Sequence, residues 1–388
     1  MKNIDTEYDY IIVGAGSAGC VLANRLSKNP KNSVLLLEAG REDKSITLKM
    51  PGAVLLNLKS TKHNWAFKGE PEPELAGRQL QHDRGKTLGG SSSINGMVFI
   101  RGNSLDYEGW RQMGCDGWGY ADVLPYFKKM ESYSGGGDDF RGDTGPLRVH
   151  RSVPKDPLSI AFIKAGKEAG YKETDDISGY CQEGFGIFDR TVFKGERWST
   201  TRGYLDPVRD RENLTIITKA LVCKLILENN KATGVCFKDN KNKIFNVKSN
   251  KEVILCAGAV GSPHILMLSG IGPKDHLKSM GINLIADMPG VGQNLQDHPD
   301  FMIKYKCLKP VTLWPKTKKL NSIGAGIQWL LTKEGMCASN HFDSVACIRS
   351  GPGVEYPDLQ LCISPIAMEN NSWQPLKEHA FQVHVGLM

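Results

Sequence analysis

The glycine pattern near the start of the chain constrains the fold more than any other feature. Residues 14–19 read GAGSAG, and they follow the short apolar run 8–13. Apolar residues with helical spacing come next, and a second apolar run at 34–37 ends at Glu38. This order of strand, glycine turn, helix, strand and acid is typical of a dinucleotide-binding βαβ unit.

Each glycine of this unit, and the acid that follows it, has a physical task. Gly14 permits a tight turn, Gly16 lets the backbone approach a pyrophosphate, and Gly19 lets the helix pack against the strand. The start of the helix then offers free N–H groups and a positive dipole end to the phosphates. Glu38 can accept hydrogen bonds from ribose hydroxyls and disfavours a 2′-phosphate. The motif alone does not separate FAD from NAD.

A second glycine-rich segment lies at 85–96, GKTLGGSSSING. Its glycines and serines cannot pack a core, but they can bring backbone amides against a flat polar ligand, and Asn95 adds a side-chain donor and acceptor. A flexible linker is the alternative. The apolar stretch 97–100, which follows immediately, weighs against it.

Composition limits the other classes of function. With 388 residues and 40% hydrophobic content, the chain can form two domains or lobes. The net charge of +7 is not gathered into a stripe of Lys and Arg, so nucleic-acid binding is not expected, whereas peripheral contact with an anionic membrane stays open. The ten cysteines show no CxxC spacing, so we expect reduced, mostly buried thiols and no metal site.

No signal-peptide pattern and no apolar run of membrane-spanning length is present in the sequence. The expected location is the cytoplasm, with contact at the inner face of the membrane left open.

The remaining patterns predict individual elements. A helix is expected over 156–171, and short strands over 214–218, 221–227, 232–237 and 244–247. A buried strand at 252–256 should lead into a helix capped by Ser262, with Pro263 at its first position. Residues 380–388 alternate as a strand, and because a globular chain seldom stops inside a strand, we expect a C-terminal truncation.

Two long segments carry a family resemblance. Residues 85–108 and 258–272 are similar to the two signatures of the glucose–methanol–choline (GMC) oxidoreductases, and the N-terminal glycine pattern agrees with them. Residues 338–342 (ASNHF) and 382–386 (QVHVG) resemble the choline dehydrogenase branch in particular. The resemblance covers essentially the whole chain.

The resemblance implies a mixed α/β fold: a Rossmann-like FAD-binding lobe, and a second, substrate-binding lobe built on an antiparallel sheet. We expect the FAD-binding lobe at 1–150 and 200–300, and an incomplete substrate-binding lobe at 151–199 and 301–388. The family position that in some relatives holds FAD covalently is Ile94 here, so non-covalent FAD is expected. The implied cofactor-binding residues are Gly14, Gly16, Ser17, Ala18, Gly19, Glu38, Ala39, Trp65, Gly89, Gly90, Asn95, Gly96, Met97, Val98 and Val222.

The implied reaction is FAD-dependent oxidation of a primary alcohol to an aldehyde, with choline and betaine aldehyde as the leading pair. The alternatives are another alcohol, or an inactive flavin-binding fragment. The family's catalytic His is expected beyond Met388, so no catalytic residue is assigned and this fragment alone is expected to be inactive. His298, His341 and His384 are read as structural, although His384 could face the substrate cavity.

The sequence leaves the electron acceptor open between oxygen, a quinone and a soluble carrier. An NAD-dependent dehydrogenase and a lyase of the same family are competing classes. A quaternary ammonium substrate favours aromatic faces, for which Trp314, Trp329 and Trp373 are available, although core or surface roles are the simpler reading of each.

Overall fold

The computed structural model describes residues 5–369 and 374–388. The chain divides into two compact units. Unit 1 comprises Met1–Lys49, Leu56–Asn95 and Ser199–Gln296, and unit 2 comprises Met50–Leu55, Gly96–Trp198 and Asp297–Met388. These bounds differ from the expected lobes, because residues 96–150 fall in unit 2 and not with the glycine turn of residues 14–19.

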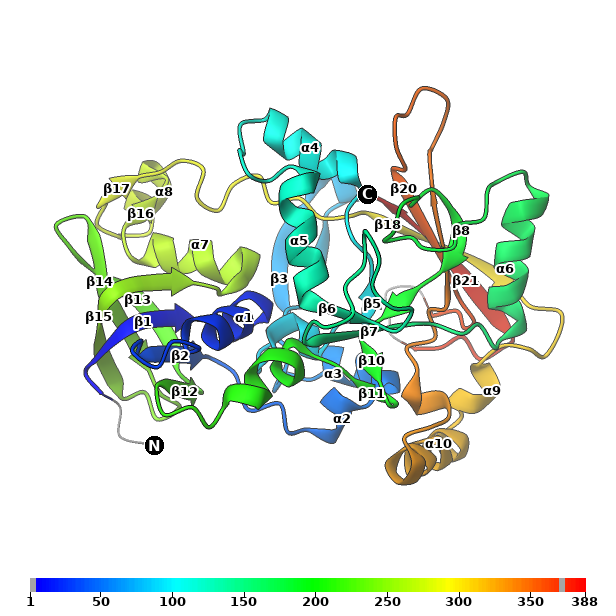
Figure 1. Ribbon diagram of the computed structural model, residues 1–388, viewed down its shortest axis with the longest axis horizontal. Coiled ribbons are helices and arrows are strands. Elements are labelled where there is room, and N and C mark those ends of the chain that lie inside the picture. Colours follow the sequence, from blue (N-terminus) through cyan, green and yellow to red (C-terminus); the bar gives the residue numbers. More distant parts are fainter. Residues whose placement is uncertain (1–4, 370–373) are drawn as a thin grey trace. The chain divides into compact units, whose positions relative to one another are not determined.

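Unit 1 is built on a six-stranded sheet of order β12-β2-β1-β15-β14-β13. The four neighbouring strands β12, β2, β1 and β15 pair in parallel. Strands β14 and β13 then extend the sheet in antiparallel fashion. The sheet and its helices α1 and α7 can be followed in Figure 1. Its elements are β1 (Glu7–Val13), α1 (Ser17–Leu26), β2 (Val34–Glu38), α2 (Ile46–Lys49), β3 (Phe67–Glu72), β4 (Arg78–His82), β12 (Leu214–Thr218), β13 (Leu221–Glu228), β14 (Lys231–Lys238), β15 (Ile244–Leu255), α7 (Gly258–Leu268), β16 (Ile271–Gly272), α8 (Lys274–Ser279) and β17 (Ala286–Asp287). Helix α3 (Val54–Leu58) begins in the short Met50–Leu55 segment of unit 2 and ends in unit 1.

The predicted βαβ unit is confirmed. β2 is buried along its whole length, as expected of a parallel strand covered on both faces, and α1 contacts both β1 and β2. Helix α1 turns Cys20 and Ala23, two small buried side chains, inward. Small residues on this face let the helix approach the sheet closely.

Two expectations for the second half of unit 1 are wrong. The strands expected at 244–247 and 252–256 are one twelve-residue strand, β15, which pairs with β14 in its first half and with β1 in its second. The helix that follows begins at Gly258, so Ser262 and Pro263 lie inside it. The Ser262 hydroxyl still accepts the Ala257 N–H at 3.0 Å, which is a capping contact made from within the first turns.

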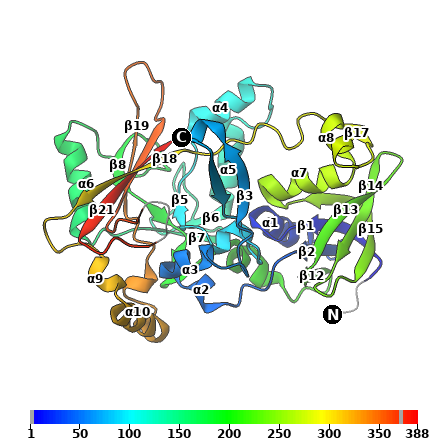
Figure 2. The same ribbon diagram turned by 180° about the vertical axis from the view of Figure 1, so that it is seen from behind.

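Unit 2 contains a five-stranded antiparallel sheet of order β18-β21-β20-β19-β8, and α6 packs against β8, β19 and β20 (Figure 2). Asp156 caps α6, as the sequence predicts. The elements are β5 (Val98–Phe99), α4 (Ser104–Gln112), α5 (Tyr120–Met130), β6 (Glu131–Tyr133), β7 (Leu147–Arg151), α6 (Pro157–Glu168), β8 (Gly184–Ile187), β9 (Asp189–Arg190), β10 (Val192–Phe193), β11 (Glu196–Arg197), β18 (Asp300–Lys306), α9 (Trp314–Thr317), α10 (Lys319–Thr332), β19 (Ser344–Ile348), β20 (Leu359–Ser364) and β21 (Ala380–Leu387).

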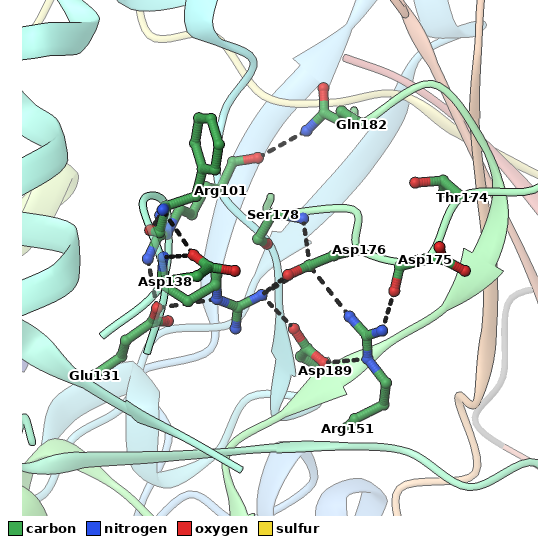
Figure 3. Close-up of polar contacts among 12 residues, drawn as sticks. Arg101, Glu131, Asp138, Arg151, Thr174, Asp175, Asp176, Ser178, Gln182 and Asp189 are labelled. Atoms are coloured by element: carbon green, nitrogen blue, oxygen red, sulfur yellow. Dashed lines mark hydrogen bonds and ion pairs between the residues drawn. The ribbon is translucent and has the colours of Figure 1, made fainter. Parts of the chain in front are cut away.

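A buried ion cluster explains why residues 96–150 belong to unit 2. The Arg141 guanidinium lies 2.9 Å from Glu131 and 2.8 Å from both Asp189 and Asp176. Figure 3 labels these three carboxylates. Arg101 adds a second contact to Glu131 at 2.5 Å. The side chains of Arg141, Glu131 and Asp189 have no exposed surface, so each charge depends on the others for its solvation. Glu131 and Arg141 are thereby fixed to β9.

Burial alone would lower the pKa of Arg141, but the carboxylates of Asp189, Glu131 and Asp176 outweigh burial and raise it. The Arg141 guanidinium also lies over the Tyr133 ring at 3.8 Å. Burial, followed by the charge of Asp189, raises the pKa of Tyr133 to about 12.

All ten cysteines are free thiols. Four are buried and two are exposed, so the expectation that most are buried is wrong. Within the described ranges, no helix combines the length and apolar character needed to cross a bilayer.

Candidate cofactor site

The turn between β1 and α1 requires glycine at its first position. Gly14 has a φ of +98°, and a Cβ there would lie 2.6 Å from the Cys256 carbonyl oxygen, which belongs to the segment after β15. A Cβ on Gly19 would lie 1.9 Å from the Gly14 carbonyl oxygen. The two glycines therefore set the turn and the close helix packing that the motif predicts.

Gly16 differs from both, because its missing side chain leaves room. A Cβ there would meet no atom closer than 3.9 Å, and the backbone is extended, with φ −76°. Packing within the protein therefore does not require glycine at this position. The space is what a pyrophosphate would need for close approach to the backbone.

The second glycine segment contacts the first. Gly89 donates its N–H to the Ala15 carbonyl at 2.7 Å, and a Cβ on Gly90 would lie 2.7 Å from the Cα of Gly16. The sequence predicts that both segments serve one ligand, and the structure brings them together on the Gly16 backbone.

The N-terminus of α1 is open to an anion. Gly16 gives no side-chain cap, and the first backbone bond of the helix runs from the Cys20 N–H to the Gly16 carbonyl at 3.0 Å. Among the described residues, no acceptor is found for the N–H groups of Ser17, Ala18 or Gly19. Such groups together form a phosphate-binding site at a helix N-terminus.

Glu38 places a carboxylate at the end of β2, where it is 5% exposed. One oxygen accepts the Ala15 N–H and the other accepts the Gly40 N–H, each at 2.8 Å. Burial outweighs these hydrogen bonds and raises the pKa of Glu38 to about 7. Each oxygen keeps a lone pair for a further donor such as a ribose hydroxyl.

A distant segment supports the glycine loop, and the sequence analysis missed it. The Ser92 hydroxyl donates to the Gly89 carbonyl at 2.6 Å and lies 2.9 Å from the Thr200 hydroxyl, 108 residues away. The Thr200 N–H donates to the same Ser92 oxygen at 3.1 Å. Two adjacent threonines carry no local sequence signal for this contact.

The other predicted residues of unit 1 take different positions. Val222 lies in β13 and its side chain is 6% exposed in the core. Trp65 stacks on Phe67 with ring centroids 5.5 Å apart. The Lys86 Nζ lies 4.1 Å from the centroid of the Trp65 ring. Ala39 lies half-buried between Glu38 and Gly40, whereas Asn95 is exposed.

The last three predicted residues, Gly96, Met97 and Val98, open the second segment of unit 2. Met97 is fully buried and has a φ of +60°, a left-handed conformation that is rare for a long side chain. Val98 begins β5 and pairs with Arg190 of β9.

Two histidines of unit 2, His298 and His341, contact backbone carbonyl groups. The His298 Nδ1–H donates to the Leu387 carbonyl at 2.7 Å, and the His341 Nε2 lies 2.9 Å from the Met336 carbonyl. Burial lowers the pKa of His341 to about 4. These contacts support the structural reading of both residues.

His384 makes two directed contacts. Its Nε2 lies 2.8 Å from the amide nitrogen of Gln382, which can only donate, so its Nδ1 carries the proton given to Asp300 at 2.7 Å. The Phe342 ring lies edge-on to His384 at 5.9 Å. Gln382, His384 and Asp300 thus form a hydrogen-bonded polar row on the sheet.

The tryptophans differ in burial. Trp329 is fully buried and donates to the Gly195 carbonyl at 2.6 Å, so it is a core residue. Trp314 packs edge-on against His379 at 5.2 Å. Trp373 lies outside the described residues.

Unit 2 also holds a cavity of about 940 Å³. Its lining includes His150, Lys155, Lys194, Lys316 and His341. Burial, and then nearby cations, lowers the pKa of His150 as well as that of His341. None of the predicted cofactor residues lines this cavity.

The chain is similar to several known proteins. It is 45% identical over 382 residues to the oxygen-dependent choline dehydrogenase of Brucella suis biovar 1 (strain 1330), a match that covers 98% of this chain and 69% of that protein. It is 47% identical over 378 residues to the enzyme of the same name from Rhizobium meliloti (strain 1021), covering 97% and 68%.

Solved structures agree in fold. Pyridoxine 4-oxidase from Mesorbium loti has a TM-score of 0.87 and 30% identity, covering 98% of this chain and 71% of that one. Formate oxidase from Aspergillus oryzae RIB40 has a TM-score of 0.88 and 25% identity, covering 99% and 73%. The expected combination of a parallel FAD-binding sheet with an antiparallel substrate-domain sheet is confirmed. Residues 8–300 match the model of the GMC oxidoreductase family, so the chain belongs to the GMC oxidoreductases, a family of flavoproteins.

Proposed function

We propose that this chain binds FAD without a covalent bond and serves the oxidation of a primary alcohol, with choline as the leading substrate. The observation that carries the cofactor proposal is the open space at Gly16. It adjoins the free N–H groups of Ser17, Ala18 and Gly19, and all of these groups lie at the end of a strand in a parallel sheet. This is the arrangement that a dinucleotide pyrophosphate requires.

Ile94 supports the non-covalent mode. It occupies the position at which some family members attach the flavin through a His, and it is 2% exposed with no nucleophilic atom. A hydrocarbon side chain there can pack but cannot form a bond to the cofactor.

When bound, FAD supplies a two-electron acceptor that takes hydride from the alcohol carbon. The residues of this chain would hold the cofactor in place. The α1 N-terminus and the Gly89–Gly90 turn receive the phosphates, and Glu38 receives the ribose hydroxyls. Because its pKa is raised, the Glu38 carboxyl ionises near neutral pH. The ionised carboxylate is the form that best accepts hydrogen bonds from both ribose hydroxyls.

The choline proposal draws on the relatives' printed names and on one group of side chains in unit 2. Asp300, whose side chain is 42% exposed, lies beside His384. The Phe342 ring packs against the same His384. A carboxylate and an aromatic ring held by one histidine would suit a quaternary ammonium group. Oxygen is the electron acceptor that the relatives' names suggest.

The general base is not assigned to a residue of this chain. His341 is kept neutral by burial, and both ring nitrogens of His384 are engaged. The matched relatives contain further residues outside the aligned 69% of their length. We expect the base to lie in that part, and this chain alone to bind FAD without turning over alcohols.

The test is an anaerobic titration of the purified, FAD-loaded chain with choline, followed by the visible spectrum. A chimera that also carries the residues of the Brucella suis relative outside the match is measured beside it. We expect flavin absorption in both proteins and bleaching in the chimera only. A colourless chain that does not take up added FAD would remove the cofactor proposal. Bleaching of the unextended chain would contradict the expected lack of a base, and an unbleached chimera would favour another alcohol.

A further inference from the structure

Asn340 reaches a backbone group that lies 244 positions earlier in the chain. Its side-chain amide donates to the Gly96 carbonyl at 2.7 Å, and it is 9% exposed. Its oxygen accepts a longer hydrogen bond from the Phe342 N–H at 3.4 Å. Both ends of the amide are therefore engaged with backbone.

The segment that Asn340 holds is strained. Met97, directly after Gly96, is fully buried with a φ of +60°. Such a backbone persists only where the surroundings fix it. The Met97 carbonyl accepts the Thr191 N–H at 2.9 Å and the Thr191 hydroxyl at 3.4 Å, so the peptide units on both sides of the strained residue are held by hydrogen bonds.

The loop that carries Asn340 is itself tied to the same segment. The Ser339 hydroxyl accepts from the Arg190 guanidinium at 2.8 Å and from the His341 N–H at 3.0 Å. Arg190 is the strand partner of Val98. Residues 339–341 and 96–98 are thus connected twice, once through Asn340 and once through Arg190.

The opposite side of Gly96 is open. A Cβ built on Gly96 would have no heavy atom of the described residues within 4 Å. The protein therefore braces the carbonyl side of this peptide and leaves the Cα face free for a ligand.

We propose that Asn340 is a positioning residue that holds the Gly96–Met97 backbone in the conformation that receives the flavin. This inference rests on the proposed FAD function, together with the expectation from the sequence that Gly96, Met97 and Val98 contact the cofactor. Without the Asn340 hydrogen bond, the Gly96 carbonyl loses the side-chain donor that holds it and the strained backbone at Met97 relaxes, so bound flavin contacts a more mobile backbone.

The test compares Asn340→Ala with Asn103→Ala. Asn103 is a matched control in the same unit: it caps α4 through the Leu105 N–H and donates to Gln182 at 3.0 Å. Two quantities are measured: hydrogen exchange of the peptide spanning 96–99 without added FAD, and FAD affinity together with the visible circular dichroism of the bound flavin.

For Asn340→Ala we expect about tenfold faster exchange at 96–99, about tenfold weaker FAD binding and an altered flavin spectrum. For Asn103→Ala we expect faster exchange in α4 alone. Unchanged exchange at 96–99 in Asn340→Ala overturns the bracing, and a wild-type spectrum and affinity in that variant overturn the role toward flavin.

A wild-type chain that takes up no FAD would instead refute the proposed function, while the exchange data would still decide whether Asn340 braces the turn. If Asn340→Ala does not fold, Asn340→Ser keeps a polar side chain but cannot reach Gly96, and the same outcomes apply.

Discussion

The Glu38 carboxylate accepts the N–H of Ala15 at 2.8 Å, although it is almost entirely buried and lies 23 residues further along the chain. The contact ties the end of β2 to the glycine turn after β1. It also puts an ionisable group where water cannot solvate it, and burial therefore raises its pKa from 4.5 to about 7.

This shift makes the stability of the FAD-free protein depend on pH. A carboxyl with a raised pKa in the folded state favours folding fully below its unfolded pKa of 4.5, and loses that contribution as pH rises through about 7. The loss is on the order of 3 kcal/mol. Denaturant unfolding between pH 4.5 and 7.5 should show a decline that Glu38→Gln flattens. An equal slope in the variant would mean that Glu38 does not titrate in this range.

Alanine at Gly16 and at Gly14 should separate cofactor binding from folding. Gly16→Ala places a methyl group in open space on an extended backbone, so stability should change by less than about 1 kcal/mol while FAD binding is lost. Gly14→Ala must adopt a φ of +98° against the Cys256 carbonyl and should cost about 2 kcal/mol or more. Thermal unfolding and FAD titration of both variants distinguish the effects. Full FAD binding by Gly16→Ala would remove the assigned role of that space.

Arg141 should be among the most sensitive positions of unit 2. Arg141→Met leaves the carboxylates of Glu131 and Asp189 buried without their central cation, and the expected loss is about 3–5 kcal/mol. Arg111→Met is the control, because that arginine pairs with Glu108 on the surface and its removal should barely change unfolding. Similar unfolding midpoints for the two variants would show that the buried cluster adds little to stability.

The parts of the fold that could be predicted from sequence are those fixed by local pattern. The glycine turn, β1, α1 and β2 follow from spacing alone, and so does the capping of α6 by Asp156. The helix after β15 was placed too late because Ser262 and Pro263 imitate a helix start, whereas Gly258 to Gly261 carry no apolar period. The local sequence pattern favours a helix start at Ser262, whereas in the folded protein the helix starts at Gly258.

Contacts across the sequence could not be predicted in this way. The Ser92–Thr200 and Asn340–Gly96 hydrogen bonds join residues 108 and 244 positions apart. The cluster around Arg141 consists of ordinary charged residues whose burial depends on the assembled unit.

Asp300→Asn tests whether the carboxylate beside His384 recognises a cationic substrate. The substitution keeps an oxygen that can accept the His384 Nδ1–H, so the polar row should survive while one negative charge is lost. For a half-exposed charge, the lost attraction is about 1 kcal/mol. Choline should therefore bind the FAD-loaded chain about fivefold more weakly, whereas its uncharged isostere 3,3-dimethylbutanol should bind as before. Flavin difference spectra during titration report both affinities. Equal weakening of both ligands would indicate a disturbed pocket, and unchanged choline binding would place the ammonium group away from Asp300.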